Sequence, residues 1–320
     1  MRWGEKPYHS LDYHYKERFG TKVYKLSLNG GFTCPNRDGT LGTSGCIFCS
    51  AGGSGDFASS ASLSIAKQVQ SAKKLLEPKL KHKDSVKYIA YFQAFTNTYA
   101  PVSHLKQLYE EALSQEDVVG IAIGTRPDCL SDDVIALLAS LAERTAVYVE
   151  LGLQTIHETT ADYIRRGYPL AVFEDAVKRL ANKNIHVVAH LIAGLPGENR
   201  EMFLSSVEFL NFLPIQGVKI AMLHILKGTD LAKAYKKAFP LYSLEEYCDI
   251  IATSVGKLRQ DIVIHRLTGD GPKNLLIAPM WTADKRNVLN QITRYFKEQN
   301  IYQGMYWEDN VYADGYTNLI

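Results

Sequence analysis

The sequence predicts an α/β protein whose parallel sheet curls into a partial, three-quarter (β/α)6 barrel of the TIM type. Short β-rich runs alternate with amphipathic stretches six times, at intervals of roughly 30–35 residues. Strands joined by helical crossovers of this length pair in parallel, with right-handed connections. Six units are too few to close an eight-stranded barrel, so an open barrel is expected. The 320 residues, 46% of them apolar, suffice for one such domain and a C-terminal extension.

Six strands are expected in the apolar runs, which are rich in β-branched residues. They cover residues 22–28, 86–92, 118–123, 146–151, 186–193 and 217–223. Helical periodicity in the intervals predicts helices over residues 63–80, 102–114, 132–144, 157–166, 172–184, 200–213 and 244–258. Ser131 and Ser243 precede acidic residues at two of these helix starts, where a serine hydroxyl can accept hydrogen bonds from the first free amides.

The alternation stops at Ile262, and the rest of the chain is rich in Trp, Tyr and Asn. We therefore expect a barrel domain over residues 1–260 and an extension over residues 261–320. The extension is expected on the substrate side, where it could serve as a lid, because ligands of such barrels sit at the carboxyl ends of the strands. A glycine-rich loop over residues 29–57 follows the first strand and belongs to the barrel domain.

The charge and cysteine content exclude several classes of protein. With 36 basic and 34 acidic residues the net charge is +2, so any site for a polyanion must be a local patch. No run approaches the ~18 apolar residues of a membrane span, and the N-terminus lacks the apolar core of a secretory signal. A cytoplasmic protein without a membrane partner is expected. Five cysteines do not fit a disulfide framework, and Cys129 and Cys248 are expected to be buried small apolar groups.

Three cysteines in the glycine-rich loop, Cys34, Cys46 and Cys49, carry the strongest chemical signal. Soft thiolates match iron, and a Cys-x2-Cys pair can reach neighbouring irons of one cube. Three ligands would leave one iron of a [4Fe-4S] cluster open for chemistry. Structural zinc is the alternative, but it normally takes four protein ligands, and the nearest candidates, His9 and His14, are poorly spaced for that purpose.

The cysteine loop, with the aromatic Phe48 just before its last cysteine, resembles the signature of the radical S-adenosylmethionine (SAM) superfamily. Eleven residues separate Cys34 from Cys46, which is longer than the commonest form, but longer gaps occur in the elongator-like group. Further runs are similar to the YtqA/YhcC-type (MnmL-like) branch of that group. They lie in the family's order at residues 91–99, 124–128, 149–155, 190–198 and 223–229.

The resemblance implies a [4Fe-4S] cluster on the three cysteines and SAM across the mouth of the barrel. Gln93, Thr96 and Asn97, at the end of the second strand, would accept the SAM amino group, although the family's usual Gly-Gly-Glu run is missing there. Arg166 matches the position that pairs with the SAM carboxylate, which a guanidinium can bind bidentately. Gly194 opens a Gly-Leu-Pro-Gly-Glu turn that would let the backbone approach the adenine.

Polar residues on otherwise apolar strands are the remaining candidates. Glu150 lies in such a strand, where a carboxylate is costly unless it meets a cation or hydroxyls. Either the cofactor or an arginine such as Arg126 could satisfy it, and we assign Glu150, Arg126 and Gln154 to the cofactor site. Histidines on apolar strands are commonly core residues. Their positions near strand ends favour a cofactor role for His190 and a substrate role for His224.

The resemblance implies tRNA as the partner and its wobble uridine, in the anticodon loop, as the substrate. The expected reaction converts a 5-carboxymethylaminomethyl group to 5-aminomethyl through a 5′-deoxyadenosyl radical, with a one-electron donor such as flavodoxin or ferredoxin. We hypothesise hydrogen abstraction from the glycine-like methylene, oxidation to an imine, and hydrolysis. Many tyrosines could stack on bases. Basic residues near the sixth unit and in the extension could bind phosphates: Lys219, Lys227, Lys233, Lys236, Lys237, Lys273, Lys285, Arg286, Arg294 and Lys297.

The substrate side is expected in the glycine- and proline-rich segment 265–281. Arg266, Asp270, Lys273 and Trp281 from this segment, together with Lys227, are predicted to face the substrate. Two other functions stay open: a radical SAM enzyme for a small metabolite, and a non-enzymatic iron–sulfur module for electron transfer or iron sensing. Salt-sensitive tRNA binding would distinguish the first alternative. A cluster with four protein ligands would fit the second better.

Overall fold

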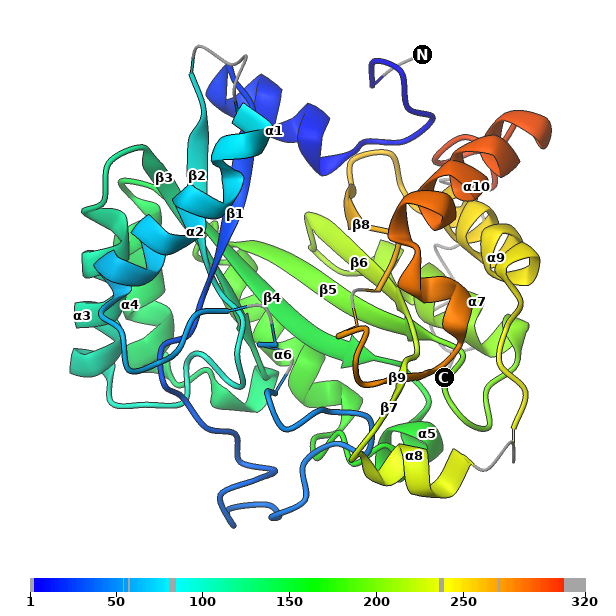
Figure 1. Ribbon diagram of the computed structural model, residues 1–320, viewed down its shortest axis with the longest axis horizontal. Helices are drawn as coiled ribbons and strands as arrows, with labels where there is room; N and C mark the ends of the chain where they lie inside the picture. The colour runs from blue at the N-terminus through cyan, green and yellow to red at the C-terminus, as the bar shows by residue number, and fades with distance from the viewer. Residues whose placement is uncertain are drawn as a thin grey trace.

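The computed structural model describes residues 3–53, 55–56, 58–80, 85–235, 239–269 and 271–307. Seven parallel strands form one curled sheet, an open half-barrel (Figure 1). Their order in the sheet is their order in the chain: β1 (Val23–Leu28), β2 (Lys87–Phe92), β3 (Val118–Thr125), β4 (Ala146–Gln154), β5 (His186–Ala193), β6 (Gly217–Met222) and β8 (Val263–Arg266). Two short strands, β7 (Ile225–Leu226) and β9 (Leu276–Ala278), pair separately and antiparallel.

Helices cover the outer face of the sheet and enclose the main apolar core. They are α2 (Ile65–Leu80), α3 (Val102–Leu113), α4 (Asp132–Ala142), α6 (Leu170–Ala181), α7 (Arg200–Phe209), α9 (Leu244–Lys257) and α10 (Lys285–Glu298). Two short helices, α5 (Glu158–Tyr163) and α8 (Asp230–Tyr235), lie at the carboxyl end of the sheet (Figure 1). Ser243 begins α9 with a capping box, in which its hydroxyl and the Glu246 carboxylate each accept from the other residue's backbone amide. Ser131 occupies the same position before α4 but makes no capping hydrogen bond with its side chain.

The predicted class, an α/β partial barrel, is confirmed, and each of the six predicted strands is present within a few residues of its expected bounds. The count of six is wrong, because β8 adds a seventh strand beyond the point where the alternation was expected to stop. Only four residues long, β8 is too short to show a strand pattern in the sequence. It pairs with β6, so part of the segment 261–320 belongs to the sheet itself.

Helix α1 (Leu11–Phe19) was not predicted, because its few apolar residues form no clear helical stripe. It packs against β1 and β8, and Tyr15 on its buried face meets Tyr148 of β4 with 5.9 Å between ring centroids. Tyr15 belongs to a small core inside the curl of the sheet that also contains Tyr91. This core fills the amino-terminal part of the half-barrel.

The glycine-rich loop after β1 is anchored by one isoleucine. The Ile47 amide donates to the Ile164 carbonyl at 3.2 Å, and the Ile47 carbonyl accepts from the Leu231 amide at 2.8 Å. Ile47 also joins an apolar cluster with Ile164, Leu223 and Leu231. Apolar packing therefore holds the loop against the carboxyl ends of the strands, at the end of the sheet opposite α1 (Figure 1).

Candidate active site

A cavity of about 320 Å³ lies at the carboxyl end of the curled sheet. The glycine-rich loop forms one side of it, and β2 to β6 with β8 form the other. Most of the predicted site residues line this single cavity: Cys34, Cys46, Cys49, Gln93, Thr96, Arg126, Glu150, Gln154, Arg166, His190, His224 and Arg266. The cavity therefore brings together residues that lie more than 200 positions apart in the sequence.

Five predicted site residues do not line the cavity: Asn97, Gly194, Lys227, Lys273 and Trp281. The Asn97 amide nitrogen donates to the Gly124 carbonyl at 2.7 Å, so this side chain ties β2 to β3. Trp281 packs on Tyr247 with 5.2 Å between ring centroids, and its indole nitrogen donates to the backbone. The apolar surface of Trp281 is therefore used for packing on Tyr247 and not for lining the cavity. Asp270 lies outside the described residues.

Short-range hydrogen bonds shape the loop that carries the three thiols. The Cys34 carbonyl accepts from the Arg37 amide at 2.8 Å, which turns the chain. The Arg37 guanidinium then donates to the Cys49 carbonyl at 3.3 Å and to the Ser50 carbonyl at 2.7 Å, which draws the two ends of the loop together. Gly45 adopts a φ of 72°, and a Cβ there would lie 2.9 Å from the Arg37 guanidinium, so this position requires glycine.

The thiols fit an iron–sulfur cluster. All three cysteines are free and line the same cavity. A hydrogen bond from Cys49 lowers the pKa of Cys46 to about 6, and the Asn36 amide supports this shift from 3.5 Å. The same contact, together with burial, raises the pKa of Cys49, so the pair holds one proton and Cys46 is the thiolate. Within the described ranges, no three His, Cys, Asp or Glu side chains are placed to hold a single metal ion. The thiolates of a cube bind separate irons.

The histidines considered for zinc lie elsewhere. His14 belongs to α1, and its ring is 6.2 Å from that of His186, the first residue of β5. His9 also packs on His14, at 5.8 Å. Both therefore lie at the amino end of the sheet, whereas the cysteines follow the carboxyl end of β1.

Arg166 is almost fully buried and is held by backbone carbonyls. Its Nε donates to the Tyr168 carbonyl at 2.9 Å, and its Nη1 donates to the Thr155 carbonyl at 2.7 Å. A third nitrogen pairs with Glu158 at 3.0 Å. Arg166 thus fixes the turn between β4 and α5, and it lines the cavity. The structure shows this positioning role, and a SAM carboxylate contact stays a proposal.

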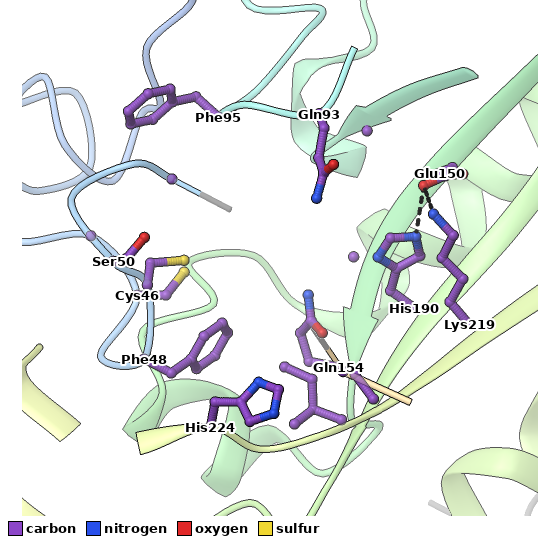
Figure 2. A pocket seen from close by; sticks show the side chains of 18 of the residues that line it. Cys46, Phe48, Ser50, Gln93, Phe95, Glu150, Gln154, His190, Lys219 and His224 are labelled. Carbon is purple, nitrogen blue, oxygen red and sulfur yellow. Dashed lines mark hydrogen bonds and ion pairs between the residues drawn. The ribbon is translucent and has the colours of Figure 1, made fainter. Parts of the chain in front are cut away.

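Two glutamines face each other across the cavity (Figure 2). Gln93 follows β2, where SAM binding was predicted, and Gln154 ends β4. The backbone of Gln154 has a φ of 67°, a left-handed conformation that is uncommon for a residue other than glycine. Backbone strain of this kind concentrates at functional sites, because surrounding contacts must hold it in place.

The deepest polar group in the cavity is a buried ion cluster around Glu150. Its carboxylate is 0% exposed and accepts from Lys25 at 2.6 Å and from Lys219. His190 Nε2 lies 3.2 Å from the same carboxylate, and the Lys219 ammonium donates to the Tyr91 hydroxyl at 3.2 Å. Figure 2 shows this cluster on the side of the cavity opposite Cys46.

Electrostatics within the cluster follow from burial and crowding. Burial by itself would raise the pKa of Glu150, but Lys219 and Lys25 outweigh it and hold the pKa well below its usual range. Burial lowers the pKa of Lys219 to about 7, with attraction to Glu150 opposing and repulsion from Lys25 adding to the shift. Burial also lowers the pKa of His190, so its ring is neutral at pH 7. Burial keeps Tyr91 protonated by raising its pKa.

The Glu150 cluster corrects two expectations. Arg126 was considered as the partner of Glu150, but it pairs with Asp128 at 2.7 Å, because these two residues flank the same short turn. Lys219 was counted with a surface basic patch, yet it is buried inside the sheet. Lys236 and Lys237 from the same predicted patch lie outside the described residues.

The sequence reasoning missed Lys25, Lys219 and Tyr91 as site residues. A signal for both lysines was present, because each stands inside an apolar strand, as Glu150 does. Alternate strand residues face the same side, and the pairing register places Lys219 between His190 of β5 and Arg266 of β8. His224 lies against the backbone of Gly269, where a Cβ would come within 2.2 Å of its ring.

Such a half-barrel, with three free thiols at its mouth and a polar interior, defines a class of cofactor-dependent enzymes. Two family models match the chain: the radical SAM superfamily over residues 33–210 and the radical SAM C-terminal domain over residues 215–298. The chain belongs to the radical SAM superfamily. Its cofactors are a [4Fe-4S] cluster and SAM. Membership favours an enzyme over an electron-transfer or sensing module.

Similar proteins indicate the branch of the radical SAM superfamily to which the chain belongs. YtqA of Bacillus subtilis, a protein without an assigned function, is 46% identical over 305 residues, covering 95% of this chain and 94% of its own length. YhcC of Escherichia coli is 36% identical and covers 89% of this chain and 90% of itself. The archaeal Elp3 of Methanocaldococcus infernus superposes with a TM-score of 0.67 at 18% identity, over 88% of this chain and 64% of that one. The YtqA/YhcC-type branch is thereby confirmed, and the fold is shared with the archaeal Elp3.

One more distant relative has a named activity. The tRNA uridine(34) acetyltransferase of Methanocaldococcus jannaschii is 27% identical over 188 residues, which are 57% of this chain and 34% of that protein. None of the helices in the described part of the chain combines the length and apolar character that a membrane span requires.

Proposed function

We propose that this protein modifies the wobble uridine of tRNA and converts a 5-carboxymethylaminomethyl group to 5-aminomethyl. The observation that carries the proposal is the similarity to a tRNA uridine(34) acetyltransferase. That similarity points to uridine 34, and the superfamily's chemistry points to a C–H bond on its substituent. The reaction would take place in the cytoplasm on the anticodon loop.

Residues in different parts of the cavity would have different roles in the reaction. Cys34, Cys46 and Cys49 hold the cluster, and a one-electron donor such as flavodoxin or ferredoxin reduces it. Gln93 and Gln154 lie between the thiols and the far wall, where SAM would bind. When bound, the reduced cluster and SAM supply a 5′-deoxyadenosyl radical. The protein orients the substrate carbon and keeps water away from it.

The reaction balances without a further oxidant. The carboxymethyl methylene loses a hydrogen atom, which becomes part of 5′-deoxyadenosine. The resulting carbon radical gives up one electron and one proton to form an imine, and that electron replaces the one spent on cleaving SAM. Water then hydrolyses the imine, which frees the aminomethyl group on uridine and releases glyoxylate.

The test is anaerobic turnover of the reconstituted, dithionite-reduced protein with tRNA that bears carboxymethylaminomethyluridine. The proposal predicts that this tRNA stimulates 5′-deoxyadenosine formation, that the nucleoside loses its carboxymethyl group, and that glyoxylate appears in equal amount. Unmodified tRNA is the matched control. SAM cleavage that is indifferent to tRNA would leave a small metabolite as the substrate, and this outcome would contradict the proposal.

A further inference from the structure

The wall of the cavity opposite the thiols presents a cation. The Glu150 carboxylate is fully covered, whereas the Lys219 side chain keeps 10% exposure and lines the cavity. Lys25, the other lysine on this carboxylate, is absent from the cavity lining. Glu150 and Lys219 both line the cavity, but only the Lys219 side chain keeps exposed surface, so a ligand can reach the lysine and not the covered carboxylate.

Lys219 shares its counter-ion. Two ammonium groups, from Lys25 and Lys219, bind the single carboxylate of Glu150. His190 and Tyr91 complete the cluster but are neutral, so neither offsets the second positive charge. A buried charge without full compensation is costly, and an anionic ligand that approached Lys219 would relieve this cost.

The other cations of the cavity have established structural tasks. Arg37 binds two backbone carbonyls of the loop. Arg126 pairs with Asp128 in the turn that follows it, and Arg166 pairs with Glu158 at the start of α5. Lys219 differs from them, because it projects from the interior of strand β6 and not from a loop. Arg266, its register neighbour on β8, lines the same wall and adds to the positive potential there.

Resting on the proposed function, we propose that Lys219 binds the carboxylate of the substrate's carboxymethylamino group and so selects this wobble substituent over uncharged ones. The carboxylate is bonded directly to the carbon that loses hydrogen. An ion pair to Lys219 would therefore place that carbon between the far wall and the thiols on the opposite side. A charge-assisted hydrogen bond of this kind supplies both affinity and discrimination.

The test compares two anticodon stem-loop RNAs, one with carboxymethylaminomethyluridine and one with the corresponding carboxamide. For the wild-type holoenzyme we expect kcat/KM to favour the carboxylate by roughly 10- to 100-fold, the range for a hydrogen bond to a charged group. Lys219→Met should reduce this preference to within a few-fold of unity. Lys219→Arg should keep most of it, because the charge is retained. Lys178→Met, on the outer helix α6, is the matched control and should keep the full preference.

The outcomes separate this inference from the proposed function. Failure of the wild type to turn over either RNA would overturn the proposed function, and this inference with it. Turnover of both RNAs at similar kcat/KM would overturn the inference alone, as would a full preference in Lys219→Met. If Lys219→Met does not fold, Lys219→Arg decides. At a pH roughly two units above the Lys219 pKa of about 7, the wild type should lose its preference for the carboxylate RNA. Lys219→Arg must keep this preference at the same pH, because the guanidinium stays charged.

Discussion

Lys219 on β6 and Glu150 on β4 form a buried ion pair inside the curled sheet, although β5 lies between their strands. The pair exists because the sheet curls, since side chains on strands two apart in a flat sheet would be far from each other. It connects the fold to the site, because its lysine faces the cavity that also contains the three thiols.

Glu150→Gln should destabilise the protein strongly. The substitution leaves the buried Lys219 and the partly buried Lys25 without a carboxylate, and breaking a buried pair in this way costs roughly 3–5 kcal/mol of the free energy of unfolding. Urea unfolding followed by circular dichroism measures the loss. Glu110→Gln, which breaks an exposed pair with Arg144, is the control and should cost less than about 1 kcal/mol. An equal loss in the free energy of unfolding for the two substitutions would show that the Glu150 cluster stabilises the protein no more than an exposed ion pair does.

The stability of the protein should depend on Lys219 above neutral pH. Burial lowers the pKa of Lys219 to about 7 in the folded state, whereas the unfolded chain keeps the ordinary value of 10.5. Between these values the unfolded state binds more protons, so the contribution of Lys219 to stability rises with pH, by up to about 1.4 kcal/mol per unit. Well below pH 7 both states are protonated, and the slope disappears.

The slope is measured as the difference in unfolding free energy between wild type and Lys219→Met, from pH 7 to roughly pH 9, below the range in which tyrosines ionise. Subtracting the variant removes groups that titrate in both proteins. A difference that stays flat, or that moves against the wild type as pH rises, would contradict the lowered pKa.

Each of Cys34→Ala, Cys46→Ala and Cys49→Ala should abolish the cluster, because two thiolates cannot hold a cube that three were placed to bind. Iron and sulfide content after anaerobic reconstitution, with electron paramagnetic resonance of the reduced protein, is the measurement. Cys248→Ala, in the buried face of α9, is the matched control and should load fully. Full loading of any loop variant would refute the ligand assignment.

Arg166→Lys should lower the free energy of unfolding by about 3 kcal/mol, because one ammonium cannot replace the fork that holds two carbonyls and Glu158. Arg165→Lys provides the control. Arg165 is exposed, and its guanidinium pairs with Asp230 at the surface, so a lysine there should change stability by less than about 1 kcal/mol. A variant Arg166→Lys that loses SAM affinity at unchanged stability would reverse this assignment and make Arg166 a pure ligand contact.

Local patterns predicted the strands and the thiols well, because apolar runs and cysteine spacing are properties of short segments. The ion cluster around Glu150 was not predicted, because Lys25 and Glu150 are 125 positions apart and only the strand register brings them together. Trp281 illustrates the opposite error. A tryptophan in a glycine- and proline-rich segment was expected at the substrate, but its large apolar area is used for packing on Tyr247.

The central claim is that the carbon next to the substrate carboxylate gives up the hydrogen. Supplying tRNA whose carboxymethyl methylene carries deuterium tests this claim directly, by mass spectrometry of the 5′-deoxyadenosine formed. The account predicts one deuterium in the 5′-deoxyadenosine, together with monodeuterated glyoxylate. Unlabelled 5′-deoxyadenosine formed at the same rate as the aminomethyl product would contradict the account and place the abstraction on another carbon.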